Sequence, residues 1–288
     1  MRGDVEGHFR DPYGQRPETH QVWQYWFVPG LDADLRTAPE KVIAPERVQA
    51  FVEALRARAI AGLGLAGVTW PFLSLHVGGC RQTLHNDAGN GRFGFVYSLT
   101  ADSRRASGGE MLVMRPGDAW GANLARPAAG ASLYWTVAPR FNRLTLFDDR
   151  LPHAVSPVEG SMDPLDGRLV LHGHLHEAGP VVSGALAPAA AAQPIAALLR
   201  GIAVHAAARL SLYQGFLSLR LTVEAGGQVG QCEVLADRVA QPSAGDIDWG
   251  PLRQELIDRV AALRFPRAAG RTAIVLPITF GAPLDEIG

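Results

Sequence analysis

Six short strand-like runs between residues 72 and 176 restrict the fold more than any other feature of this sequence. Each run is rich in β-branched, aromatic or other apolar residues, and pairs such as Gly78-Gly79, Gly108-Gly109 and Pro116-Gly117 separate them. Short runs with turn residues between them are typical of β-sandwiches and β-barrels. The sequence therefore predicts a mainly β domain with strands at 72–77, 93–100, 110–114, 132–137, 143–148 and 168–176.

One amphipathic helix is predicted before these strands, over residues 45–64. Pro45 suits the first turn of a helix, and Gly62 or Gly64 suits its end. Apolar residues recur at helical spacing between them. In the run at 93–100 the odd positions form an apolar set that we expect to pack under this helix: Phe93, Phe95, Tyr97 and Leu99.

A change of composition divides the chain near residue 180. Residues 179–199 are rich in Ala and Pro and poor in charge, which predicts an inter-domain connector with some helix. Beyond it, two strand-like runs surround Gly226-Gly227, and a helix and a last strand follow. We therefore expect a β domain at 20–178 and a small α+β domain at 200–284.

Composition excludes some classes of partner. Of the 288 residues 47% are hydrophobic and 19% charged, and a formal charge of −1 gives no electrostatic reason to expect a nucleic acid or an anionic membrane.

The first twenty residues lack the apolar core of a signal peptide, which predicts a cytoplasmic protein. Cys80 and Cys232 lie far apart without C-x-x-C spacing, so we expect two buried thiols.

His85 and Asp87 form an H-x-D pair before the run at 93–100. On an extended segment both side chains leave the same face, and imidazole and carboxylate both bind divalent first-row metals. His153 follows the run at 143–148 and is a candidate third ligand. Asp148 and Asp149 are candidate hydrogen-bond acceptors for a ligand imidazole. The alternative is that His85 and Asp87 only decorate a surface turn.

The order of these features resembles the iron(II)- and 2-oxoglutarate-dependent oxygenases, most nearly their prolyl-hydroxylase-like branch. The matching elements are the H-x-D, a G-G-E turn at 108–110, His153 followed by A-V-x-P-V, and Arg168, within about residues 20–178. The resemblance implies a double-stranded β-helix (jelly-roll) fold and Fe(2+) held by His85, Asp87 and His153. It also implies 2-oxoglutarate and O2 as co-substrates, with Arg168 binding the distal carboxylate of 2-oxoglutarate.

A dioxygenase of this kind hydroxylates an unactivated C–H bond, and the branch resembled often acts on peptide or protein side chains, prolyl ones prominently. A free amino acid or another small metabolite is the alternative substrate. A catalytically inactive binding protein is a further alternative.

The strand at 168–176 departs from the family pattern R-x-S-x-x-G-W, because Val170 and His174 replace the Ser and the Trp. Period-2 alternation places His172 and His174 on the same face as Arg168, so we expect His172 near 2-oxoglutarate and His174 near the substrate. The alternative for His174 is a polar residue where the strand runs out towards solvent. The run HGHLH also admits a metal-binding barrel of the cupin kind.

Two further residues are candidate contacts. His76 stands where the family commonly has a Tyr, and we expect it to contact the 2-oxoglutarate, with a core histidine as the alternative. Arg92 opens the run at 93–100 and is a candidate substrate contact, with a solvated arginine as the alternative.

The C-terminal part has a resemblance of its own. The runs GGQVGQCEVLADRV, LRFPRAAGRT and IVLPITF are similar to the C-terminal domain of the TonB energy transducers and related bacterial modules, over about 205–281. The resemblance implies an interaction module that recruits a protein partner or substrate, with a peptide strand pairing at the edge of its sheet.

Overall fold

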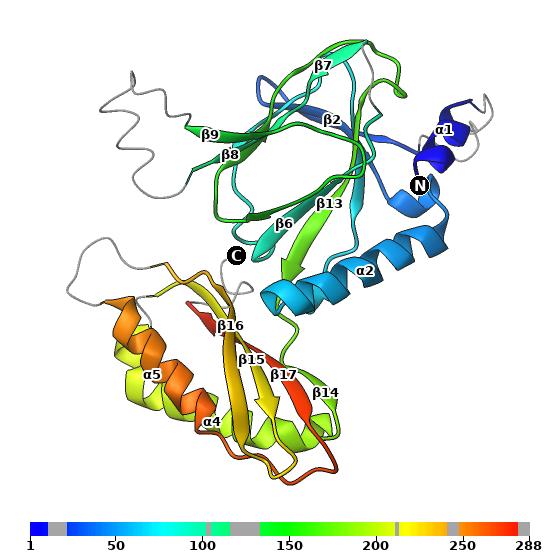
Figure 1. Cartoon of the computed structure of the whole chain (residues 1–288). Helices are drawn as coiled ribbons and strands as arrows, with labels where there is room; N and C mark the ends of the chain where they lie inside the picture. The colour runs from blue at the N-terminus through cyan, green and yellow to red at the C-terminus, as the bar shows by residue number, and fades with distance from the viewer. Residues whose placement is uncertain (11–21, 102–104, 116–132, 211–212, 241–247, 282–288) are drawn as a thin grey trace. The chain divides into compact units, whose positions relative to one another are not determined.

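Figure 1 shows the computed structural model of the chain, which describes residues 1–10, 22–101, 105–115, 133–210, 213–240 and 248–281. The chain forms two compact units, Met1–Glu53 with Val68–Leu175 and Ala54–Gly67 with His176–Gly288. Among the described residues no helix combines the length and the apolar character that crossing a membrane requires. The predicted turn at 116–117 and the first residue of the run at 132–137 lie outside the described residues.

The first unit is built from antiparallel sheets, as predicted. The larger sheet has the order β1 (Gln24–Val28), β2 (Asp32–Thr37), β4 (Phe72–His76), β13 (Arg168–His176), β6 (Phe93–Ser98) and β10 (Leu144–Asp148), with β3 (Gly67–Val68) beside β13. The second has the order β5 (Gln82–His85), β11 (His153–Val155), β8 (Met111–Met114) and β9 (Tyr134–Val137). A third pairs β7 (Ala106–Gly108) with β12 (Val158–Gly160).

This mainly β architecture is consistent with a jelly roll. The six predicted strands correspond to β4, β6, β8, β9, β10 and β13, with ends that differ by a residue or two. The short helices α1 (Arg2–Arg10) and η2 (Pro39–Lys41) complete the unit. Strands β1 and β2 were not predicted, because Pro29 and Gly30 interrupt the run QYWFVPGLDADLRT and its apolar alternation is confined to Ala33 and Leu35.

Strand β13 separates a core face from a cavity face. Its odd positions are apolar and fully buried, and they join a core cluster with residues of β4: Leu169, Leu171, Leu73 and Leu75. Its even positions from Arg168 to His174 line a cavity. Because side chains alternate along a strand, one β-strand serves both purposes.

Helix α2 spans Pro45–Leu63, close to the predicted range. Phe51 on this helix contacts Phe95 and Tyr97, with ring centroids 6.0 and 4.9 Å away, so the odd positions of β6 do pack under the helix. The helix ends where Gly64 adopts a φ of +73°. The left-handed conformation is inexpensive for glycine, so this residue suits the C-terminal cap.

The second unit holds a four-stranded antiparallel sheet in the order β14 (Val181–Gly184), β17 (Thr272–Phe280), β15 (Gly215–Val223) and β16 (Val229–Asp237). Helices α4 (Pro188–Leu210) and α5 (Trp249–Ala261) share its core (Figure 1). The carboxylate of Asp248 caps α5 by accepting a hydrogen bond from the N–H of Gly250 at 3.0 Å.

Residues 179–199 were predicted to be a connector with some helix, and the helix is present. These residues form β14 and the first half of α4, and Leu186, Ala191 and Ile195 are buried in the core of the second unit. A segment rich in Ala and poor in charge is typical of a linker, but it is also apolar enough to be buried. Pro188 occupies the first position of α4, where its missing N–H costs nothing.

Both cysteines are free thiols. Cys80 is buried, as predicted, whereas Cys232 on β16 is only half-buried.

Candidate metal centre

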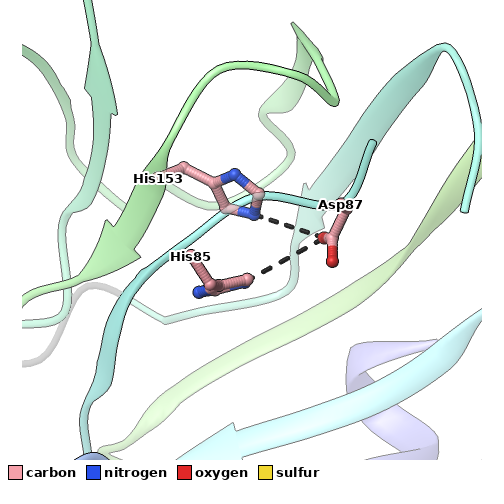
Figure 2. A group of neighbouring side chains, drawn as sticks. All are labelled: His85, Asp87 and His153. Carbon is pink, nitrogen blue, oxygen red and sulfur yellow. Dashed lines mark ion pairs between the residues drawn. The ribbon is translucent and has the colours of Figure 1, made fainter. Parts of the chain in front are cut away.

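The three predicted ligands converge at one place in the first unit (Figure 2). His85 ends β5 and His153 begins β11, and the two residues are directly paired in the antiparallel register. Their ring centroids lie 4.3 Å apart. The Oδ2 atom of Asp87 lies 3.3 Å from Nε2 of His153 and 4.0 Å from Nε2 of His85. The three ligand atoms lie within 4.8 Å of one another.

Backbone carbonyls fix the tautomer of both imidazoles. Nδ1 of His85 is 2.7 Å from the carbonyl oxygen of Thr83, and Nδ1 of His153 is 3.0 Å from that of Leu151. A carbonyl oxygen only accepts, so each Nδ1 carries a proton and donates it. In the neutral imidazoles the lone pair then lies on Nε2, which is the atom that faces Asp87. This arrangement is the one that orients histidine ligands in metal sites.

Asp87 is held in a fixed orientation as well. Its Oδ1 accepts a hydrogen bond from Nδ2 of Asn90 at 3.1 Å, and its N–H donates to the carbonyl of Asp149 at 2.9 Å. Burial raises the pKa of Asp87, whereas the form of His153 that is protonated on both nitrogens donates a hydrogen bond from Nε2 and, with its charge, lowers this pKa further, to about 2. The carboxylate is therefore ionised, with Oδ2 left to face the two imidazoles. With both imidazoles neutral, three electron-pair donors face one point, and this donor set fits a divalent metal.

A second group of possible ligands shares Asp87 and adds Asp149 and His174. Nδ1 of His174 lies 3.0 Å from Oδ2 of Asp149, which is completely buried. Asp149 thus engages His174 and not His153. Asp148 instead binds Arg150, with 2.7 Å between Oδ2 and Nη2. The expectation that either carboxylate orients His153 is therefore wrong, since the carbonyl of Leu151 has that role.

The triad opens into a cavity of about 360 Å³. Of the predicted contacts, His76, Arg168, His172 and His174 all line it. Arg92 is not among the described residues that line this cavity. Its backbone pairs with Leu175 and Asp149, and its side chain is half-buried.

Arg168 and His76 form a buried pair. They are directly opposite on β13 and β4, and Nη1 of Arg168 lies 3.3 Å from Nδ1 of His76. Burial lowers the pKa of Arg168 to about 10, although the charge of Asp34 raises it. Burial and the charge of Arg168 hold the pKa of His76 well below its usual value, so His76 is neutral and its Nδ1 accepts from Arg168.

This pair leaves two buried donors without an acceptor among the described residues, Nε of Arg168 and Nε2 of His76. An unsatisfied buried donor costs about 1–3 kcal/mol. A guanidinium and an imidazole N–H together suit an anion, and a carboxylate above all.

Separate partners hold the three histidines of HGHLH. Nε2 of His172 lies 2.8 Å from Oγ of Ser74, Nδ1 of His174 lies 3.0 Å from Asp149, and Nδ1 of His176 donates to the carbonyl of Glu177 at 2.9 Å. Among the described residues no group of possible metal ligands contains two of these histidines. The structure therefore does not support a cupin-like site on this strand.

Several residues that line the cavity were not predicted, and they come from β1, β2 and β4: Trp26, Asp32, Asp34, Arg36, Phe72 and Ser74. The signal that could have identified them is the alternation of Asp32, Asp34 and Arg36. On a strand these three charged residues share one face.

No protein-family description matches the chain, and no curated protein sequence does. Among solved structures, a prolyl hydroxylase from Trichoplax adhaerens, in complex with a hypoxia inducible factor oxygen degradation domain peptide, is 17% identical with a TM-score of 0.44. The match covers 61% of this chain and 78% of the Trichoplax chain. A Pseudomonas putida prolyl-4-hydroxylase is 20% identical with a TM-score of 0.42, over 62% and 88% of the two chains.

A 2OG-Fe(II) oxygenase family protein from Burkholderia pseudomallei is 14% identical with a TM-score of 0.32, over 52% and 70% of the two chains. TM-scores below 0.5 mark a distant likeness, so the chemistry of the site has to come from its own residues.

Proposed function

We propose that this chain is an iron(II)- and 2-oxoglutarate-dependent dioxygenase that hydroxylates an unactivated C–H bond. The observation that carries the proposal is the convergence of two imidazoles with fixed tautomers and one ionised carboxylate beside a cavity that also holds a buried guanidinium. Two histidines and one carboxylate on one face of an octahedral ion leave three positions free, an arrangement typical of non-haem iron(II) oxygenases.

His85, Asp87 and His153 would hold the iron, which when bound supplies the activation of dioxygen. Other residues of the chain would bind the co-substrate. Arg168 and the Nε2–H of His76 would donate to the distal carboxylate of 2-oxoglutarate, which satisfies the two buried donors and neutralises the charge of the co-substrate. The neutral His172 presents no competing positive charge there.

The proposed reaction balances without a further reductant. One C–H bond of the substrate becomes C–OH, and 2-oxoglutarate becomes succinate and carbon dioxide. The substrate and 2-oxoglutarate each lose two electrons, and dioxygen accepts all four. The substrate is a peptide or protein side chain, as the sequence resemblance implies, or a small metabolite. Recruitment of a protein partner by the second unit stays a prediction.

The test measures succinate formed from 2-oxoglutarate in air with added iron(II). We expect His85→Ala and Asp87→Ala to abolish succinate formation and to weaken manganese(II) binding in calorimetry by at least tenfold, because each removes a ligand. His176→Ala is the matched control, since this imidazole does not line the cavity. A wild-type chain that binds neither manganese(II) nor 2-oxoglutarate would disprove the proposal.

A further inference from the structure

A second arginine lines the same cavity. Arg36 lies on β2, and its Nε donates to Oδ2 of Asp34 at 2.8 Å. Asp34 is completely buried, whereas the side chain of Arg36 is 23% exposed. A buried carboxylate thus anchors one edge of the guanidinium, while the rest of the group reaches the cavity.

An aromatic ring fixes the plane of the same guanidinium. The Cζ atom of Arg36 lies 5.1 Å from the ring centroid of Trp26, within the range of a cation–π contact. Trp26 is paired with Asp34 in the register of β1 and β2, so both neighbours of Arg36 come from one cross-strand pair. Among the described residues neither Nη atom has a hydrogen-bond partner. Arg36 therefore presents a preoriented pair of donors, the form in which arginine binds a carboxylate through two parallel hydrogen bonds.

Arg36 and Arg168 belong to different places in the cavity. Arg36 and Val170 both pair with Ser74, so they share one row across β2, β4 and β13. Arg168 starts the neighbouring row, opposite His76. From strand spacing and rise per residue, the Cα atoms of the two arginines lie on the order of 12 Å apart. Each guanidinium is also held by partners of its own, Arg168 by His76 and Arg36 by Asp34 and Trp26, so we treat them as two separate groups for binding anions.

The positive charges of both guanidinium groups nevertheless act on the same two histidines. Burial lowers the pKa of His172 to about 3, and the positive charges of Arg36 and Arg168 lower it as well. The same two arginines lower the pKa of His76. The proposed co-substrate neutralises only one of these cations. Asp34 balances part of the remaining charge, because it is the ion-pair partner of Arg36 and its charge also raises the pKa of Arg168. Its Oδ1 atom has no partner among the described residues.

We propose that Arg36 binds the carboxylate of the molecule that is hydroxylated, which makes the substrate a small carboxylic acid, with a free α-amino acid as the class that fits best. This inference rests on the proposed oxygenase function. An amino acid carries both a carboxylate for Arg36 and a positive group that matches Asp32, which lines the cavity from the same face of β2. A cavity of about 360 Å³, at the lower end of ligand pockets, also favours a small molecule.

The first experiment varies the probe. Free L-amino acids, their C-terminal amides, dipeptides with a free C-terminus and peptides blocked at both ends are each incubated with the full chain, iron(II) and 2-oxoglutarate. We expect at least one free amino acid to raise succinate formation and to gain an oxygen atom by mass spectrometry, and its amide to do neither. Turnover of a dipeptide would assign the carboxylate to a peptide terminus. Equal turnover of acid and amide, or turnover of blocked peptides alone, overturns the proposal, as does a panel without any substrate.

The second experiment separates the two arginines. We expect Arg36→Gln to raise the KM of the acid found in the panel by about 30-fold or more, because a charge-assisted contact is lost, and Arg36→Lys to restore part of it. The Kd of 2-oxoglutarate for the manganese(II)-loaded chain stays within twofold in both variants, which also shows that they fold. We expect Arg168→Gln to raise the Kd of 2-oxoglutarate and to leave the KM of the acid nearly unchanged. Arg58→Gln, an exposed arginine on α2, changes neither constant.

The two possible failures look different. A wild-type chain that binds no 2-oxoglutarate with manganese(II) and releases no succinate ends the oxygenase proposal itself. A chain that does both, while Arg36→Gln leaves the KM of its substrate unchanged, ends only the assignment of Arg36.

Discussion

At the scale of single residues, His172 is the most direct reporter of the charge in the cavity. Burial is the largest cause of its low pKa, about 3, and Arg36 and Arg168 add to it. In an unfolded chain the same imidazole titrates near 6.5. The folded chain therefore keeps His172 neutral over a range of pH in which the unfolded chain protonates it.

This difference predicts how pH acts on stability. Between about pH 6.5 and pH 3 the unfolded chain binds one proton more at His172 than the folded chain, so the free energy of unfolding falls as the pH falls, by up to about 1.4 kcal/mol per pH unit. We expect the imidazole signals of His172 in NMR to stay constant from pH 7.5 to pH 5. His172→Gln, which keeps a hydrogen-bonding group for Ser74, identifies these signals. A midpoint near 6.5 would contradict the prediction.

The candidate metal ligands could be picked out from the sequence, but their supporting residues could not. His85, Asp87 and His153 carry chemistry that the sequence displays as residue types at a recognisable spacing. The carbonyls of Thr83 and Leu151 that fix the tautomers belong to the backbone, and every residue has one. Their role exists only once β5 and the turn before β11 are folded.

Arg36 was missed for a different reason. Its strand carries three charged residues within six, which is unusual for a strand that lies inside a sheet. Charge alternation has the period of a strand, but only Ala33 and Leu35 alternate with the charges, and so short a pattern is also found in polar loops.

At the scale of elements, β13 connects the core to the cavity, and a single substitution can test each face. Leu171 is completely buried in a cluster with Leu73 and Leu169. We expect Leu171→Ala to lower the free energy of unfolding by about 2–5 kcal/mol, because it leaves a cavity that the neighbouring side chains do not fill.

The measurement is urea unfolding followed by tryptophan fluorescence. Leu144→Ala on β10 is the control, since this leucine is 41% exposed, and the expected change there is within about 0.5 kcal/mol. Equal losses in the two variants would mean that the buried face of β13 has been misassigned. The manganese(II) affinity of folded Leu171→Ala should stay unchanged, because the triad lies on β5, β11 and the turn after β5.

At the scale of the whole molecule, the division of the chain was the least predictable feature. Helix α2 is continuous, yet its residues are shared between the two units. The second unit also takes its first strand from the segment predicted to be a linker. A local pattern shows that a segment is apolar or helical, but not which core it joins, because that depends on partners distant in sequence.

Two truncated chains test this division. A chain that ends at Leu199 keeps Leu186, Ala191 and Ile195, which are at most 5% exposed in the full chain, but lacks the rest of the second unit that covers them. A chain that ends at Glu177 lacks these residues as well. We expect the chain that ends at Leu199 to bind more of a hydrophobic dye than the chain that ends at Glu177, and to aggregate on size-exclusion chromatography. Both truncations remove the same β15, β16 and β17, so any difference comes from residues 178–199 alone. Equal dye binding and equal elution as monomers would restore the segment to the role of a solvated connector.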